Sequence, residues 1–497
     1  MDALATTNWH DRAARMQFRT QAFIDGKFVP SASGKTFDKV SPRDGKVIAH
    51  VAECDREDVN RAVAAARRTF ESGVWRDQHP RARKAVLLNL ALLIETHADE
   101  LALLETLDMG KPIRDSRSID VPLSARCVQY YAEAIDKLYD QVGPSGTDAM
   151  SLILREPLGV IGIVVPWNFP LMMAVWKVAP ALATGNSVVL KPAEQSPLSA
   201  IRLAELAIEA GLPPGVLNVV PGFGETAGQA IGRHMDVDML AFTGSTEVGK
   251  YFMRYSGESN LKRVSLECGG KTPHIIMPDA ADLDKAAAEA AGGIFFNQGE
   301  VCNAGSRLLV HESIKDAFLE KVVHYGQKWV PGDPLDPKTR MGAIVDKRQH
   351  ERVLGYIEKG KAEGAVLKSG GAAAHADCGG YYVQPTVFDK VDSGMTIARE
   401  EIFGPVLSTL TFKTTEEAFK IANDTIYGLA AAIWTRDIST AMKAARTIKA
   451  GSVWINCFDA GDITTPFGGF KQSGFGRDKS LHALEKYTDL KSVWIQL

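Results

Sequence analysis

One cysteine stands where a nucleophile could be presented to a substrate. Cys302 lies in a polar, glycine-containing stretch (residues 295–307) between an alanine-rich helical run and an apolar strand at 308–310. A turn between a helix and a strand can present a side chain to a cleft while rigid elements hold its backbone. Because a thiolate is the strongest nucleophile among ordinary side chains, Cys302 is a candidate for covalent catalysis. Most free cysteines are small buried hydrophobic residues, and this stretch alone leaves both interpretations open.

A carboxylate that could act as a general base ends another apolar run. Glu267 is followed by Cys268 and two glycines. A carboxylate in apolar surroundings has a raised pKa and can accept a proton near neutral pH. A surface salt bridge is the competing interpretation. A second acidic loop, at 399–405, also leads into a strand, and there a solvated turn is the simpler interpretation.

Polar loops follow several predicted strands where a nucleotide could bind. They are residues 166–170, 191–194, 222–224 and 242–249. The last opens a helix, so its amides and the Ser245 hydroxyl could hold a phosphate. None has the GxGxxG dinucleotide fingerprint. Each alone is more simply an ordinary loop, but several in one sheet favour a nucleotide site.

The elements that must position these residues indicate an α/β protein. An Asp25-Gly26 turn predicts a hairpin at 22–29, and Asp55 can cap a helix whose apolar face includes Val59 and Phe70. Further helices are expected at 81–96 and around 128–138. Short apolar strands at 161–165, 187–190, 216–220, 239–242 and 264–266 alternate with helices, which predicts a parallel, doubly wound sheet.

A second α/β unit is expected after Gly270. Its strands are predicted at 308–310, 382–388, 406–412 and 430–434, and its helices at 284–295, 313–325, 348–362 and 415–422. Residues 370–380 are expected to form a surface loop. A strand at 151–155 follows a polar stretch at 141–148 and needs a pairing partner from elsewhere, and the last residues, 489–497, alternate as a strand does.

Composition excludes several functional classes. A chain of 497 residues is expected to form two or three domains, and a net charge of −3 argues against a nucleic-acid or anionic-membrane partner. Six scattered cysteines without a CxxC pair indicate a reducing compartment, with neither a disulfide framework nor a metal site. The N-terminus has no apolar signal region, and prolines or charges interrupt the longest apolar runs. A cytoplasmic location is therefore expected.

Seven motifs in order resemble the NAD(P)-dependent aldehyde dehydrogenase superfamily. They surround Asn168, Lys191 with Glu194, Ser245, Glu267, Cys302, Glu401 with Phe403, and the run from Pro466 to Lys471. The resemblance covers nearly the whole chain. It implies a Rossmann-like cofactor domain (residues 1–138 and 159–266), an α/β catalytic domain (267–473) and a β oligomerisation arm (139–158 and 474–497). A homodimer or homotetramer is expected.

The resemblance also implies roles for the catalytic residues. Cys302 would attack an aldehyde, and the Asn168 amide with the cysteine N–H would hold the oxyanion. Hydride loss to the nicotinamide would leave a thioester, which a water activated by Glu267 would hydrolyse to a carboxylic acid. Lys177 and Asp478 match positions of a proton relay, although many relatives have Glu at the latter.

Cofactor and substrate residues follow from the same resemblance. Cofactor contacts are assigned to Trp167, Lys191, Glu194, Gly224, Ser245, Glu401 and Phe403. Glu194 would accept a hydrogen bond from the ribose 2′-hydroxyl, which favours NAD over NADP. An apolar sleeve for the aldehyde is assigned to Phe169, Met173, Trp176, Val301, Asn303 and Phe467, with Asp120, Asp459 and Asp462 at its mouth.

Carboxylates above an aromatic sleeve suit a cationic head group. The chain resembles bacterial ω-aminoaldehyde dehydrogenases of polyamine and arginine breakdown, which act on γ-glutamylamino or guanidino aldehydes. A general aliphatic or aromatic aldehyde dehydrogenase, or one of the betaine-aldehyde type, is the alternative. A CoA-acylating relative, a non-catalytic protein with this fold and a cofactor-free cysteine hydrolase are further hypotheses. The presence of Glu267 argues against the CoA-acylating relative, and the presence of all the expected chemical residues argues against the non-catalytic protein. The lack of a recognisable histidine partner motif for Cys302 argues against the cysteine hydrolase.

Overall fold

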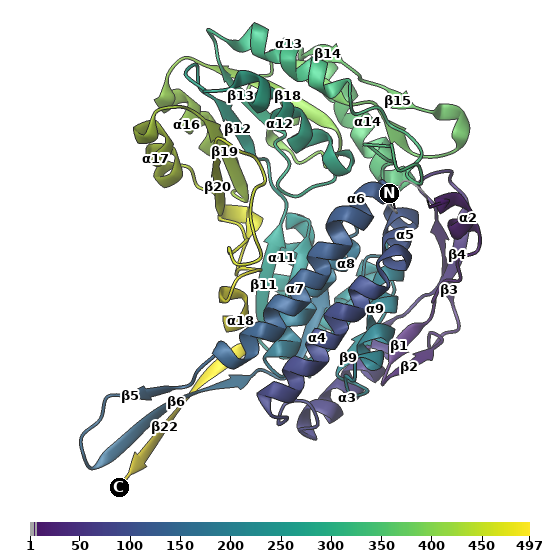
Figure 1. Ribbon diagram of the computed structural model, residues 1–497, viewed down its shortest axis with the longest axis vertical. Helices are drawn as coiled ribbons and strands as arrows, with labels where there is room; N and C mark the ends of the chain where they lie inside the picture. Colours follow the sequence, from purple (N-terminus) through teal and green to yellow (C-terminus); the bar gives the residue numbers. More distant parts are fainter. Residues whose placement is uncertain (1–3, 5–6) are drawn as a thin grey trace.

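The computed structural model describes Leu4 and residues 7–497, which form two lobes and a projecting arm (Figure 1). An eight-stranded sheet organises one lobe and a seven-stranded sheet the other. A three-stranded sheet forms the arm, at the lower left of Figure 1. The two lobes and the arm give the α/β architecture expected from the sequence.

Five parallel strands form the centre of the first sheet, as the apolar runs predict. The sheet order is β2-β1-β9-β8-β7-β10-β11-β21, and only the edge strands β1, β2 and β21 pair antiparallel. The strands are β1 (Ala22–Ile24), β2 (Lys27–Val29), β7 (Val160–Val164), β8 (Ser187–Lys191), β9 (Leu217–Val219), β10 (Met239–Gly244), β11 (Arg263–Cys268) and β21 (Gly474–Phe475). The hairpin predicted around Asp25-Gly26 is β1–β2.

Helices bury both faces of this sheet, which explains why its strands are continuously apolar. Ile161 and Ile163 contribute to the larger core, whereas Val160 and Val164 contribute to a separate core on the other face. The capping box of Asp55 starts α3, as predicted. The helices of this lobe are α2 (Trp9–Ala14), α3 (Arg56–Glu71), α4 (Pro80–Thr96), α5 (Ala98–Met109), α6 (Ile113–Asp115), α7 (Val121–Ala134), α8 (Pro170–Ala183), α9 (Leu198–Glu209), α10 (Gln229–Arg233) and α11 (Thr246–Gly257).

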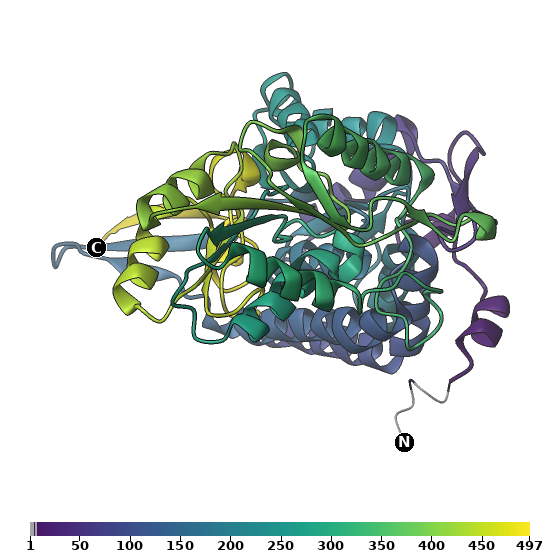
Figure 2. The ribbon, with the colours of Figure 1, turned by 90° about the horizontal axis from the view of Figure 1, so that it is seen from above.

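The helix predicted around 128–138 begins earlier than expected. It is α7, which starts at Val121 and continues from the π-helical turn η1 (Ser116–Asp120). Pro122 is compatible with the first turn of a helix, because its missing N–H has no intrahelical partner there. Beside the sheet, β3 (Thr36–Val40) and β4 (Val47–Ala52) form a separate hairpin. Figure 2 shows this purple hairpin at the opposite end of the molecule from the arm.

The second sheet has the order β14-β17-β18-β13-β12-β19-β20. Its strands are β12 (Pro273–Ile276), β13 (Arg307–His311), β14 (Val366–Ser369), β17 (Thr386–Asp389), β18 (Val406–Phe412), β19 (Ala430–Trp434) and β20 (Ser452–Ile455). Its helices are α12 (Leu283–Phe295), α13 (Lys315–Gly326), α14 (Lys347–Ala362), α15 (Thr396–Arg399), α16 (Thr415–Asn423) and α17 (Ile438–Thr447). The predicted helices at 284–295, 313–325, 348–362 and 415–422 are α12, α13, α14 and α16.

Two strand predictions in this lobe were incomplete. The strand expected at 382–388 is divided into β16 (Tyr382–Val383) and β17, because Pro385 has no N–H to donate to a ladder. β16 pairs with β15 (Ala373–Ala374), inside the expected loop. β12 was not predicted from its short apolar run, yet it lies between β13 and β19.

The isolated strand at 151–155 finds its partner at the far end of the chain. It belongs to β6 (Ala149–Pro157), which pairs along its whole length with the C-terminal strand β22 (Thr488–Gln496). A short strand, β5 (Gln141–Gly143), pairs with the other side of β6, within the stretch expected to be a polar loop. Residues 474–487 return instead to the first lobe, as β21 and the short helix α18 (His482–Glu485).

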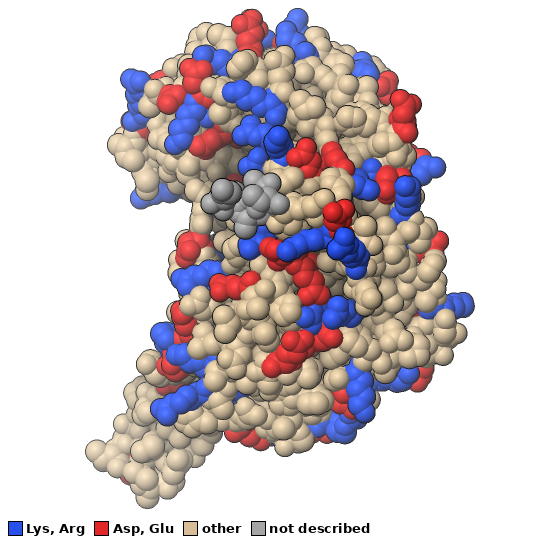
Figure 3. All heavy atoms as spheres, turned by 45° about the vertical axis from the view of Figure 1, so that its right-hand side comes forward, with Lys and Arg blue, Asp and Glu red and all other residues tan. Residues whose placement is uncertain are grey.

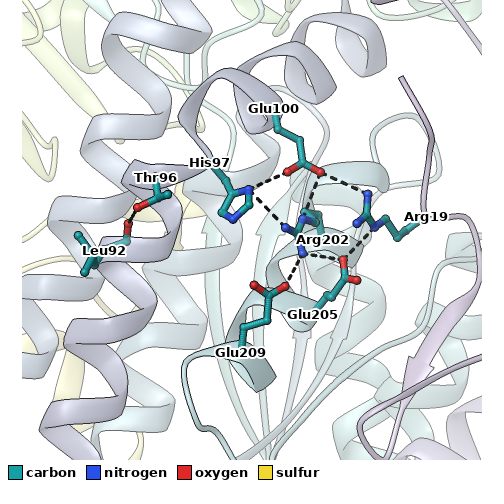
Figure 4. Close-up of polar contacts among 8 residues, drawn as sticks. All are labelled: Arg19, Leu92, Thr96, His97, Glu100, Arg202, Glu205 and Glu209. Atoms are coloured by element: carbon teal, nitrogen blue, oxygen red, sulfur yellow. Dashed lines mark hydrogen bonds and ion pairs between the residues drawn. The ribbon is translucent and has the colours of Figure 1, made fainter. Parts of the chain in front are cut away.

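An ion-pair network ties three segments of the first lobe together (Figure 4). The Arg202 guanidinium of α9 lies 3.1 Å from Glu100, 2.6 Å from Glu205 and 2.8 Å from Glu209. Arg19, from the N-terminal segment, reaches Glu205 at 2.8 Å and Glu100 at 3.4 Å. Arg202 is 4% exposed, so its charge depends on these carboxylates rather than on water.

No helix in the described part of the chain has both the length and the apolar character needed to cross a bilayer. On the face drawn in Figure 3, acidic and basic side chains are intermixed over both lobes, while the surface of the arm carries few charges.

Candidate active site

A cavity between the two lobes holds most of the expected site residues. It contains about 910 Å³ of space between protein atoms, part of it open to solvent. Its walls come from the carboxyl ends of β10 and β11, from the start of α8, from α14 and from the loops that carry Cys302 and Glu401. It is lined by Pro166, Trp167, Asn168, Met173, Trp176, Thr243, Gly244, Ser245, Glu267, Cys268, Gly269, Cys302, Gln349, Arg352, Glu401, Phe403, Phe467 and Asp478.

A strained turn presents Cys302 to this cavity. After α12 the chain passes through η4 (Phe296–Gly299), in which Asn297 and Gln298 have φ of 48° and 58°. Both side chains are buried and hold the turn: Asn297 Nδ2 donates to the Asn168 carbonyl at 3.1 Å, and Gln298 Oε1 accepts from the Gly342 N–H at 2.9 Å. Strain of this kind persists only where the surroundings fix it, and it concentrates at functional sites.

The Cys302 thiol is not activated in the protein alone. Burial, followed by the nearby charges of Glu401, Asp459 and Glu267, raises its pKa above that of an ordinary cysteine. The residue is partly exposed to the cavity. The thiol is therefore protonated near neutral pH, and attack on a substrate requires that this proton be removed.

Asn168 is held beside the cysteine turn. It precedes Pro170, the first residue of α8, and its Nδ2 donates to the Glu300 carbonyl at 2.9 Å. Asn168 donates to the loop that carries Cys302, and Asn297 of that loop donates to the Asn168 carbonyl. These two hydrogen bonds hold the Asn168 amide and the cysteine loop together. The expected oxyanion donor and the expected nucleophile thus share a wall of one cavity.

Glu267 ends β11 with its carboxylate buried and free. Among the described residues, neither of its oxygens has a hydrogen-bond partner, and the residue is 3% exposed. Burial raises its pKa well above the usual value, and the negative charge of Asp478 raises it further. A Cβ at Gly468 would lie 2.8 Å from Oε1, so the glycine leaves room for the carboxylate. Such a group can take a proton from water, as a general base must.

A buried row of charges lies behind Glu267. Asp478 accepts from Lys177 of α8 at 2.5 Å, and both side chains are 1% exposed. The other Asp478 oxygen accepts from Lys486 at 2.5 Å, a lysine that sequence reasoning missed. The backbones of Asp478 and Phe467 exchange two hydrogen bonds of 2.8 Å, which fixes the aspartate against the cavity wall. Burial raises the pKa of Asp478 and the two lysines lower it, and the net result is a lowered pKa.

Four of the expected dinucleotide contacts also line the cavity. Ser245 caps α11 and accepts from the Val248 N–H at 3.2 Å. The Glu401 carboxylate accepts from the Gly270 N–H at 3.1 Å, and burial raises its pKa to about 7. The rings of Trp167 and Phe403 meet edge to face, with centroids 5.1 Å apart. These groups suit a ribose, a phosphate and an aromatic ring.

Three further predicted cofactor residues lie beyond the cavity lining. Lys191 Nζ is buried and lies 3.3 Å from Glu194, whose side chain is 30% exposed. Gly224 begins the π-helical turn η3 (Gly224–Gly228), and a Cβ there would meet nothing within 4 Å. Gly228 of the same turn approaches Lys191. The open space at Gly224, the exposed carboxylate and the buried lysine fit the adenosine half of a dinucleotide.

The expected sleeve is only partly exposed to the cavity. Met173, Trp176 and Phe467 line it, and the Trp176 and Phe467 ring centroids are 5.5 Å apart. Phe169, Val301 and Asn303 are buried and do not line it. Phe169 stacks on Phe296, with centroids 6.4 Å apart, and thus supports the wall from behind.

Asp120 was wrongly expected at the mouth. It is fully buried and forms an ion pair with Lys111, which is also fully buried, and the Lys111 ammonium lies 3.7 Å from the Phe169 ring centroid. The sequence shows Asp120 as a lone acidic residue at the start of a helix and contains no local signal of this ion pair across nine positions.

The other two mouth carboxylates have different surroundings. Asp459 has a positive φ of 54° and accepts from Asn303 Nδ2 at 2.7 Å, while burial raises its pKa. Asp462 is exposed, and the Thr464 N–H that it accepts at 3.0 Å helps to lower its pKa. Lys479, which was not predicted from the sequence, interacts electrostatically with both carboxylates. Its ammonium is 5.6 Å from the Trp176 ring centroid, and both carboxylates act on its pKa.

Gln349 and Arg352 of α14 also line the cavity without having been predicted. Gln349 Nε2 donates to the carbonyls of Ile402 and Phe403 at 3.0 and 2.8 Å, and Arg352 donates to the Glu401 carbonyl at 2.9 Å. They occupy successive turns on the polar side of an amphipathic helix, where nothing local distinguishes them from solvent-facing residues.

Comparison with known proteins agrees with this geometry. The sequence profile of the Aldehyde dehydrogenase family matches residues 28–493. The chain is 52% identical to the NADP/NAD-dependent aldehyde dehydrogenase PuuC of Escherichia coli, over 98% of both chains. It superposes on a crystal structure of an indole-3-acetaldehyde dehydrogenase complexed with NAD+ with a TM-score of 0.98 and 59% identity, covering 98% of this chain and 99% of that one.

A γ-glutamyl-γ-aminobutyraldehyde dehydrogenase structure from Burkholderia cenocepacia is as similar, with a TM-score of 0.97, 59% identity and coverage of 98% and 99%. Both the sequence over nearly its whole length and the backbone of both lobes therefore lead to one conclusion: the chain belongs to the aldehyde dehydrogenase family.

Proposed function

We propose that this protein oxidises an aldehyde to its carboxylic acid through a covalent intermediate on Cys302, with NAD as the hydride acceptor. The observation that supports this most strongly is that Cys302, Asn168 and Glu267 line one cavity together with Ser245 and Glu401. A thiol, an amide donor and an unpartnered carboxylate are the groups that thioester chemistry needs.

The steps follow from the placement of these groups. The Cys302 thiol gives its proton to a water molecule in the cavity, and its sulfur bonds to the aldehyde carbon. The carbonyl oxygen becomes an oxyanion that the Asn168 amide can stabilise by hydrogen bonding. When bound, NAD supplies the acceptor for the hydride that leaves this adduct, which becomes a thioester. Glu267 then removes a proton from a water that attacks the thioester, and the thiolate of Cys302 leaves as the acid forms. The charged row behind Glu267 is proposed to receive its proton.

The cofactor proposal rests on residues of this chain. Glu194 and Lys191 would hold the adenosine ribose, and Gly224 leaves room for the nucleotide. Ser245 at the start of α11 would donate a hydrogen bond to the pyrophosphate. Glu401, held by Gly270, would bond the second ribose, beside Trp167 and Phe403. The relative named PuuC is NADP/NAD-dependent, so discrimination here is proposed as a preference for NAD that depends on Glu194.

The proposed substrates are ω-amino, γ-glutamylamino or guanidino aldehydes from polyamine or arginine breakdown. The similarity to the γ-glutamyl-γ-aminobutyraldehyde dehydrogenase of Burkholderia cenocepacia supports a charged head group, as do the carboxylates of Asp459 and Asp462. The alternative is a neutral aliphatic or aromatic aldehyde. It is favoured by the Trp176–Phe467 pair, by the neutralised Asp120 and by the name of the indole-3-acetaldehyde relative.

A panel of aldehydes separates these two candidates. If the head group is recognised by charge, 4-aminobutanal gives a higher kcat/KM than neutral hexanal, and Asp459→Asn reduces this preference about tenfold, equivalent to about 1.4 kcal/mol. Asp377→Asn serves as the matched control, because it removes an exposed carboxylate that does not line the cavity. Equal kcat/KM for both aldehydes would favour the neutral substrates.

The domain division, assembly and location are proposed together. Residues 1–138 and 159–266 would form the NAD-binding domain and 267–473 the catalytic domain. Residues 139–158 would form the arm together with β22 of the expected segment 474–497, because residues 474–487 return to the first lobe, and subunits would associate through the arm as a dimer or tetramer. The exposed apolar side chains of the arm, and the few charges on its face drawn in Figure 3, support association. A cytoplasmic location is consistent with all six cysteines being free thiols.

The direct test of the activity is the Cys302→Ala variant. It should form no NADH from any aldehyde in the panel, while its circular dichroism and thermal unfolding stay as in the wild type. A Cys302→Ala protein that oxidised aldehydes at the wild-type rate would refute the proposed mechanism. Adding coenzyme A to the wild type and finding acyl-CoA rather than free acid would show a different acyl acceptor.

A further inference from the structure

Lys486 connects the buried charges behind Glu267 with the surface of the molecule. The side chains of Lys177 and Asp478 are each 1% exposed, whereas that of Lys486 is 11% exposed. Lys177 and Lys486 bind opposite oxygens of the Asp478 carboxylate, each at 2.5 Å. The three groups thus form a continuous hydrogen-bonded row, and Lys486 is its most exposed member.

The elements around this row account for its geometry. Lys177 comes from α8, Asp478 from the segment that bridges to Phe467, and Lys486 from the residue that follows α18. Glu267 interacts electrostatically with Asp478, Lys177, Lys486 and Arg477. Cys127 of α7 and the phenol of Tyr487 face Asp478 as well.

The proposed function creates a need for such a path. Every hydrolysed thioester transfers one proton from water to Glu267, and that proton must leave before the next turnover. Glu267 is 3% exposed and has no hydrogen-bond partner among the described residues, and it lines the cavity that substrate and cofactor would fill during turnover.

We propose that Lys486 is the exit of a proton path that runs from Glu267 along Lys177 and Asp478 to solvent. This inference rests on the proposed hydrolytic function. Glu267 passes its proton to Lys177 through a water molecule, and Lys177 at the same time passes another proton to Asp478 Oδ2. Asp478 Oδ1 passes one to Lys486, and Lys486 gives one to water. One proton enters and one leaves, so the row returns to its starting charge of two cations and one anion.

The electrostatics are compatible with this role. Burial lowers the pKa of Lys486, while the charge of Asp478 opposes that effect. A lysine with a lowered pKa can lose a proton at neutral pH more readily than an exposed one. Lys486 is a positioning residue in the sense that it acts through Asp478 and touches neither substrate nor cofactor.

Two substitutions separate proton transfer from simple charge. Lys486→Met removes the cation, so the pKa of Glu267 should rise and the acidic limb of the kcat–pH profile should move up by about one pH unit. Lys486→Arg keeps the positive charge, so the acidic limb of the kcat–pH profile should stay at the wild-type pH. Because an arginine does not release its proton, kcat should fall and its solvent isotope effect should exceed that of the wild type. Small amines added to Lys486→Ala should restore kcat.

The control and the decisive outcomes follow from the same structure. Lys315 binds Asp389 at 2.9 Å with side-chain exposures of 14% and 3%, so Lys315→Met removes a lysine of similar burial far from the cavity. It should leave the kcat–pH profile unchanged. Lys486 variants with the wild-type profile and no rescue by amines would overturn the proposal and assign proton release to the cavity itself.

The pre-steady-state burst of NADH keeps the two proposals distinguishable. Lys486→Met should show a normal burst, because hydride transfer precedes hydrolysis, followed by slow turnover. If the wild type itself formed no NADH, the proposed function would fail. If the burst were normal and the later turnover unchanged in Lys486→Met, only the role of Lys486 would fail.

Discussion

At the scale of single residues, the site combines a protonated nucleophile with a buried carboxylate whose pKa is raised. Burial raises the pKa of both Cys302 and Glu267, and the charge of Glu267 raises that of Cys302 further. A buried thiol without a cationic neighbour is unreactive, which protects it between turnovers. Reactivity must therefore be created when cofactor and substrate fill the cavity.

Asn168→Ala removes the side-chain oxyanion donor while leaving the thiol in place. We expect kcat/KM to fall by about 10²–10³-fold, the usual effect of losing one such donor. Steady-state NADH formation measures it. Asn303→Ala, which changes a nearby buried amide bonded to Asp459, is the matched comparison and should have a much smaller effect. A change of less than threefold for Asn168→Ala would contradict the assigned role.

Glu194→Gln tests the cofactor preference. The carboxylate would repel the 2′-phosphate of NADP, and its loss should raise the NADP-to-NAD ratio of kcat/KM about tenfold, or about 1.4 kcal/mol. The ratio is measured with one aldehyde and both cofactors. An unchanged ratio would mean that Glu194 does not face the ribose.

Residue-scale prediction from the sequence succeeded where a side chain follows a strand and failed where distant segments meet. Asn168, Ser245 and Glu267 stand at strand ends, and a parallel sheet brings such positions together without further information. Lys486 becomes significant only because α18 packs next to α8, which no local pattern reveals. Asp120 was misjudged for the same reason, because its partner Lys111 was unknown.

At the scale of secondary-structure elements, strained and capped segments hold the site. The turn at Asn297 and Gln298 fixes Cys302, and Gln349 of α14 fixes the backbone beside Glu401 through two carbonyls. Regular helices such as α3 and α4 were predictable, because their apolar periodicity and caps are local. β12 was missed because four residues cannot establish a period, although the strand lies inside the second sheet.

The Arg202 network should stabilise the contact between α5, α9 and the N-terminal segment. Arg202→Met would leave three partly exposed carboxylates without their shared cation. We expect the free energy of unfolding to fall by about 2 kcal/mol, between the values typical of buried and of surface ion pairs. Denaturant unfolding measures it.

Arg233→Met is the control, because Arg233 forms a single pair with Glu258 in which both side chains are 45% exposed. Its loss should change the free energy of unfolding by less than about 1 kcal/mol. Equal effects for the two variants would show that the network adds nothing beyond an ordinary surface pair.

At the scale of the whole molecule, the arm is the least self-sufficient part. Its three strands project from the lobes and expose Val142, Leu490 and Trp494, which are 75%, 59% and 62% accessible (Figure 1). A narrow sheet with exposed apolar residues and open edges gains stability when another surface covers it. The sequence indicated an unpaired strand, but only the fold shows that its partner is the C-terminal strand of the same chain.

Leu490→Asp with Trp494→Asp tests whether the arm mediates association. Both residues lie on one face of β22, so charges there should dissociate the oligomer, as measured by light scattering of the purified protein. Ile438→Asp, at a 70% exposed position in the other lobe, should leave the mass unchanged. An oligomer that survives the double substitution would assign the interface to another surface.

The most direct test of the central claim is the intact mass of Glu267→Gln after one turnover. This variant keeps Cys302 and Asn168 but lacks the base, so it should form one equivalent of NADH and retain the acyl group. Mass spectrometry should find that acyl group on the peptide containing Cys302. An unmodified Cys302, with multiple turnovers at the wild-type rate, would contradict the account.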